Sequence, residues 1–175
     1  MIVDALKVGV VVSVAAVVQT AVFSGMSVLG GVPDVLLVTL VAVALVRGAT
    51  MGAVAGFFAG LVVDIALLDT LGMTSLLLTL AGYWAGRYGE TVPSGRRYAP
   101  YLAVAVMTVL VAVGSLVLRF MLGEPAPAQE VLVETLAQSL ALNLLATWPV
   151  FAIVRRLLPR RPGVTMFGPE VGVLG

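Results

Sequence analysis

The chain has 175 residues, of which 61% are hydrophobic and 11% are charged, with a formal net charge of +1. A soluble domain is about a quarter charged, so this chain has too little polar surface to cover a water-facing exterior, and lipid must be its solvent. It contains no cysteine and no histidine, which removes the usual residues of zinc sites and of Ser/His or Cys/His catalysis, and it has no basic run typical of nucleic-acid binding. We therefore expect an integral membrane protein that is not an enzyme and has no catalytic, cofactor-binding or metal-binding residues.

The sequence contains six successive apolar segments. A helix needs roughly 20 residues to cross a hydrocarbon core, and the length of each segment is judged against that number. They cover residues 6–28, 35–46, 48–68, 71–88, 98–122 and 131–158. Glycines, prolines and acidic residues separate them, as in "LGGVPD", "DTLG" and "GEPAPAQE", and such residues end helices. The sequence predicts an all-α membrane protein with six transmembrane helices in one domain, residues 1–158, followed by a short cytoplasmic tail, residues 159–175.

The first two segments each need an interpretation. Segment 6–28 is too long for a signal peptide, has Asp4 before it and lacks a clear cleavage site, so it is predicted to be a helix. The stretch from Asp34 to Arg47 rises only about 20 Å as a helix. It is either a short span beside a locally thinned bilayer or part of a re-entrant pair, and we favour the span. Asp34 follows Pro33 and is expected to begin the helix, where its charge suits the helix dipole.

Small residues recur at every fourth position of the third and fourth segments. The glycines of these rows are Gly48, Gly52, Gly56, Gly60, Gly82 and Gly86. Each glycine costs roughly 1 kcal/mol against alanine in a helix interior, so close packing must offset the loss. Either the rows let helices of this chain approach one another, which we favour, or they form a groove for the helix of a partner protein.

Asp64 follows the glycine row in "GATMGAVAGFFAGLVVD". It lies about 24 Å above Gly48 along a helix, in the outer part of the hydrocarbon region, where a carboxylate is a functional candidate. Alternatively it caps the following turn, accepts hydrogen bonds from the "DTLG" backbone or pairs with Arg119. We favour a structural role, because a proton relay needs a chain of such groups and the inner half has none.

The last two segments carry polar faces. Thr108, Ser115 and Arg119 share one face of segment 98–122, and Asn143 belongs to a polar row at four-residue spacing in segment 131–158. Lipid contact would be costly for these side chains, so they are expected to face other helices. They either form hydrogen bonds between helices or line a polar cavity open to the outside. The outer-side polar candidates are Asp34, Asp64, Arg119 and Asn143.

The basic residues predict the orientation. With the N-terminus in the cytoplasm, only Arg119 of the ten Lys and Arg residues falls on the outer side, as the positive-inside rule requires. Both termini are therefore predicted to be cytoplasmic.

Residues 32–88, "VPDVLLVTLVAVALVRGATMGAVAGFFAGLVVDIALLDTLGMTSLLLTLAGYWAGRY", resemble the rod shape-determining protein MreD family. The resemblance rests on the order of the Pro-Asp helix start, the Arg-Gly turn, "GFFAGLVVD", the Leu-Gly pair and "GYWAG". It implies a multi-pass subunit of the rod (elongation) complex in the bacterial cytoplasmic (inner) membrane, beside the bitopic protein MreC. Such a subunit helps connect MreB filaments with RodA and its penicillin-binding transpeptidase during lateral peptidoglycan synthesis. The family has no established catalytic residues to transfer.

A second likeness supplies the alternative function. The helix arrangement is also similar to that of the substrate-binding subunits of energy-coupling-factor vitamin transporters, which implies a solute-binding membrane subunit. Those subunits dock through an alanine-xxx-alanine pair in their first helix, whereas here Ala16 is followed at that spacing by Thr20, and Ala15 by Gln19. The MreD-like scaffold is therefore the preferred hypothesis.

Overall fold

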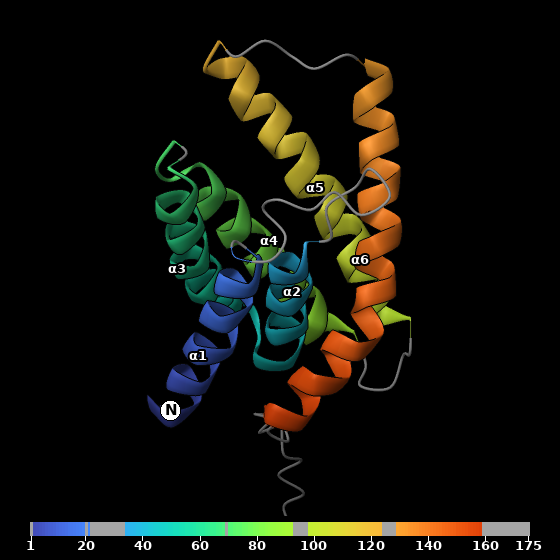
Figure 1. Ribbon diagram of the computed structural model, residues 1–175. Coiled ribbons are helices and arrows are strands. Elements are labelled where there is room, and N and C mark those ends of the chain that lie inside the picture. The colour runs from blue at the N-terminus through green and yellow to red at the C-terminus, as the bar shows by residue number, and fades with distance from the viewer. Residues whose placement is uncertain are drawn as a thin grey trace, which may run out of the picture.

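The computed structural model describes residues 2–19, 21, 34–68, 70–92, 98–123 and 129–158. The described residues form six helices, which confirms the all-α prediction (Figure 1). The helices are α1 (Ile2–Val18), α2 (Val35–Arg47), α3 (Ala49–Leu67), α4 (Met73–Thr91), α5 (Ala99–Met121) and α6 (Gln129–Leu157). The N-terminal end of α1 and the C-terminal end of α6 lie at the same end of the bundle (Figure 1).

The helix bounds match five of the six expected segments closely. The first segment differs, because α1 begins at Ile2 and ends at Val18, whereas a helix was expected over residues 6–28. Residues 22–33 lie outside the described residues, as does the expected tail, residues 159–175.

Helix α2 lies at the centre of the bundle. It contacts each of the other five helices, and every residue from Leu36 to Leu45 is buried. Its sequence "VLLVTLVAVALV" is apolar on all faces, which is typical of a helix surrounded by others. The short second segment is therefore stabilised by protein on every side.

Three of the described helices are long and apolar enough to cross a membrane. They are Ala49–Leu67, Ala99–Met121 and Val133–Leu157, while Lys7–Val18 and Val35–Arg47 are shorter apolar helices. Large apolar side chains such as Phe58, Val117 and Leu145 are exposed on the long helices, where only lipid or another apolar surface favours them. The chain is a membrane protein, and the count of six spans stays a prediction.

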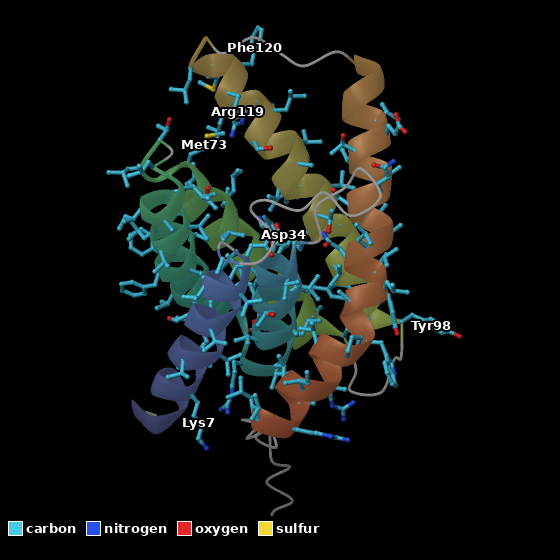
Figure 2. All side chains as sticks on the ribbon, viewed as in Figure 1. Lys7, Asp34, Met73, Tyr98, Arg119 and Phe120 are labelled. Carbon is cyan, nitrogen blue, oxygen red and sulfur yellow. The ribbon has the colours of Figure 1, made fainter. Side chains whose placement is uncertain are left out.

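Charged side chains are unevenly distributed along the bundle. Five basic residues lie toward the end that holds the start of α1: Lys7, Arg47, Arg87, Arg155 and Arg156. Arg119 lies near the opposite end, in the last turn of α5 (Figure 2). The cytoplasmic location of the termini is a prediction that rests on this distribution.

Candidate functional site

The glycine row of α3 lies directly against the backbone of α4. A methyl group on any of three α3 glycines would overlap α4 main chain: the carbonyl oxygen of Gly82 for Gly52, that of Leu78 for Gly56, and Cα of Ser75 for Gly60. The atoms in the way are backbone, so no side-chain rotation makes room. The two helices are therefore in van der Waals contact along the whole row, as small residues permit between membrane helices.

The glycines of α4 make the same contact in the opposite direction. A methyl group on Gly82 would overlap the carbonyl oxygen of Gly52, and one on Gly86 would overlap Cα of Ala49. The hydroxyl of Ser75 also donates to the carbonyl oxygen of Phe57 over 3.0 Å, which adds a hydrogen bond across the same interface. These rows are occupied within the chain and leave no room for a partner's helix between α3 and α4.

Gly48 has a different role from the other glycines of the row. It forms the turn between α2 and α3 with φ at +91°, a backbone conformation that glycine adopts without steric cost. A Cβ there would also lie 2.7 Å from Oε1 of Glu90.

Helices α3 and α4 form a hairpin in which a carboxylate near the end of each helix caps the start of the other. Asp64, near the end of α3 and 0% exposed, accepts from the N–H groups of Gly72 (2.8 Å), Thr74 (3.2 Å) and Ser75 (3.3 Å), which begin α4. Such groups have no partner within a helix, and a carboxylate also suits the positive end of the helix dipole. Of the roles considered for Asp64, these distances support hydrogen bonding to the backbone of the turn.

Glu90 does the same for α3. It lies in the last turn of α4, and its Oε1 accepts from the N–H of Ala49, the first residue of α3, over 2.9 Å. Its Oε2 is 3.2 Å from Arg87 Nη1. Each helix of the hairpin thus supplies a carboxylate that stabilises the start of the other.

A third cap lies at the start of α2 (Figure 2). Asn143 of α6 accepts from the N–H of Asp34 through Oδ1 (2.8 Å), Gln19 at the end of α1 accepts from that of Val35 (2.9 Å), and Asp34 itself accepts from that of Leu37 (2.8 Å). Inside a membrane every such N–H group needs a protein partner. Helices α1 and α6 therefore help determine where α2 begins.

Asn143 also connects α6 to α5. It is 1% exposed, its Nδ2 donates to Oγ1 of Thr108 over 3.1 Å, and its backbone carbonyl accepts from the hydroxyl of Thr147 over 2.7 Å. The central part of the polar rows on α5 and α6 is thus engaged in hydrogen bonds between and within helices. Of the four outer-side candidates, the structure brings Asp34 and Asn143 together, while Asp64 lies at the α3–α4 turn and Arg119 near the end of α5 (Figure 2).

Gln19 and Glu90 were missed as structural residues by the sequence reasoning. For Glu90 a signal was present, because α3 begins after Gly48, which has no side chain to cap the helix, so an acceptor had to come from elsewhere. Gln19 carries no such signal, since nothing in the local pattern relates it to Val35.

Comparison with known protein families gives a match. The family model described as rod shape-determining protein MreD matches residues 3–160, from the first turn of α1 past the end of α6. No curated protein and no solved structure matches the chain.

Proposed function

The chain belongs to the MreD family, and on that premise we propose that it is a non-catalytic, multi-pass subunit of the rod complex in the bacterial inner membrane. The family acts in determining rod shape, and the match over residues 3–160 is the observation that carries the proposal. The two capping carboxylates support a structural rather than a catalytic role, because Asp64 and Glu90 accept hydrogen bonds from helix starts.

The proposed partner is MreC. Through it the subunit helps couple MreB filaments to RodA and its penicillin-binding transpeptidase during lateral peptidoglycan synthesis. Because the glycine rows of α3 and α4 face each other, the transmembrane helix of MreC docks on an outer face of the bundle. Association there depends on van der Waals packing and a few hydrogen bonds, since lipid offers little hydrophobic drive between helices.

The experiment is purification of the full-length chain from native membranes, with MreC measured by mass spectrometry. We expect MreC in near-equal amount. Photo-crosslinking residues are then placed at one exposed position per helix to identify the docking face. The positions are Val14 of α1, Phe58 of α3, Val117 of α5 and Leu145 of α6, and buried Leu40 is the matched control. A stoichiometric small solute without MreC would overturn the proposal in favour of a solute-binding subunit.

We also propose that residues 1–158 form one membrane domain with both termini in the cytoplasm. The proposal is supported by the basic side chains at the end of the bundle where α1 starts and α6 ends. A reporter enzyme fused after Gly175 should be active on the cytoplasmic side, and activity confined to the outer side would contradict the orientation.

A further inference from the structure

The exposed apolar surface is shorter on the α3–α4 hairpin than on α5. On α5, exposed apolar side chains continue from Leu102 to Met121, which corresponds to about 28 Å of helix. On α3 they run from Val54 to Leu68, about 21 Å at the same rise. The ends of α5 and α6 accordingly extend well beyond the α3–α4 turn (Figure 1).

The apolar surface of the α3–α4 hairpin ends at aromatic side chains on one side of the bilayer and at the hairpin turn on the other. On α4 it ends at Tyr83 and Trp84, whose rings meet edge to face at 5.8 Å, and Arg87 follows within one turn. Aromatic rings of this kind favour the headgroup level. At the other end lies the hairpin turn, where Leu68 is 92% exposed. From the turn at Leu71 to Trp84 the apolar surface of α4 is about 20 Å long.

A helix can tilt to fit a bilayer that is too thin, but tilting does not help a surface that is too short. A hydrocarbon core of about 30 Å fits α5 and is about 9 Å thicker than the apolar surface of the hairpin is long. The peptide groups of a lipid-exposed turn also need water or protein partners. If the outer surface of the bilayer lies at the level of the turn, the hydrocarbon core matches the short apolar surface and water reaches the peptide groups of the turn.

The side chains on the outward face of α3 favour lipid over another helix as the neighbour. Phe57 and Phe58 are both exposed and pack edge to face at 5.5 Å. Close approach of a second helix is favoured by small residues, and on α3 these are turned toward α4. We propose that the bilayer is locally thinned beside the α3–α4 hairpin, so that this face of the protein selects phospholipids with short acyl chains while the face formed by α5 and α6 does not. The inference needs only that the chain is embedded in a membrane, and it does not depend on MreC.

The two tryptophans of the chain provide the test. Trp84 lies on α4 and is 54% exposed, and Trp148 lies on α6 and is 72% exposed. They lie about 10 Å and about 13 Å, respectively, from the helix ends on the same side of the bundle. Trp84→Phe and Trp148→Phe therefore leave one reporter at a comparable depth on each face.

Each full-length variant is reconstituted into vesicles that mix a brominated phosphatidylcholine of one chain length with an unbrominated one of another, from dimyristoleoyl through dioleoyl to dierucoyl. Quenching of the single tryptophan gives the relative association of the two lipids. With Trp84 as reporter, we expect short-chain lipid to associate about three to ten times more strongly than long-chain lipid. With Trp148 as reporter, we expect no preference for short chains.

Three outcomes would overturn the proposal. Equal preference at both tryptophans would mean that the mismatch is not local, and preference for dierucoyl lipid at Trp84 would mean that the hairpin is not short. Absence of quenching at Trp84 would mean that protein, such as a second copy of the chain, covers this face. Matching circular dichroism spectra of the two variants provide the control for folding.

Discussion

Replacing Gly56 by alanine places a methyl group where the structure has the main chain of Leu78. The new Cβ would lie 2.6 Å from the carbonyl carbon of Leu78, while ordinary van der Waals contact begins at 3.4 Å. The helices α3 and α4 must therefore separate by about 0.8 Å or more. A gap of that size forfeits a quarter to a half of the dispersion energy of each contact that it opens.

The expected loss of stability can be estimated from two opposing effects. Overpacking of a tight interface costs about 1–3 kcal/mol, and alanine regains up to about 1 kcal/mol of helix propensity. The free energy of unfolding should fall by about 1–2 kcal/mol, and further in Gly56→Leu, because a larger side chain needs a wider separation. For a chain of this size, each kcal/mol lowers Tm by roughly 2–4 °C.

The assay is thermal unfolding of the purified full-length protein in one detergent, followed by circular dichroism. The matched control is Gly9→Ala in α1, where a Cβ would meet nothing within 4 Å. This control should be as stable as the unchanged protein or slightly more stable. The reasoning is refuted when Gly56→Ala unfolds at the same temperature as Gly9→Ala or at a higher one.

Substitutions at three further positions test two helix caps and the α2–α3 turn in the same unfolding assay. Asp64→Ala should lower the free energy of unfolding by about 1–3 kcal/mol, because three N–H groups lose their acceptor, and Asp64→Asn should recover part of the loss through its amide oxygen. Asn143→Ala should cost a similar amount, since it leaves the partly buried N–H of Asp34 and the buried hydroxyl of Thr108 without this partner, and an unchanged Tm would contradict the cap at the start of α2. Gly48→Ala should cost about 1–2 kcal/mol, because its φ of +91° is unfavourable for a residue with a Cβ; equal stability would show that the α2–α3 turn relaxes.

The part of the fold that depends on local pattern could be predicted from the sequence. Runs of apolar residues and the turn residues between them located five helices closely, and the four-residue spacing of Gly52, Gly56 and Gly60 indicated a close helix contact. The pattern does not identify the opposite helix, because small-residue rows look alike whether they face the same chain, a second protein or a second copy. Chain connectivity favours α4 as that helix, since α4 follows α3 after a short turn.

The capping residues show what local pattern cannot supply. Glu90 reaches Ala49 across 41 residues of sequence and Asn143 reaches Asp34 across 109. The first pair exists because antiparallel α3 and α4 bring the end of one helix beside the start of the other, and the second exists because the middle of α6 lies beside the start of α2. Periodicity within one helix contains no information about such contacts. Asp64 was accessible to sequence reasoning because its partners begin only eight residues later, at Gly72.

The central structural claim is that the backbones of α3 and α4 are in direct contact at their glycines. The most direct measurement is a double-mutant cycle between Gly52 and Gly82, because each of them faces the carbonyl oxygen of the other. Each single substitution to alanine should destabilise the protein. Their combination should cost less than the sum by about 0.5 kcal/mol or more, because the first methyl group already separates the helices. The pair Gly52→Ala and Gly9→Ala should be additive. Neutral single substitutions at Gly52 and Gly82, or strict additivity between them, would contradict the claim.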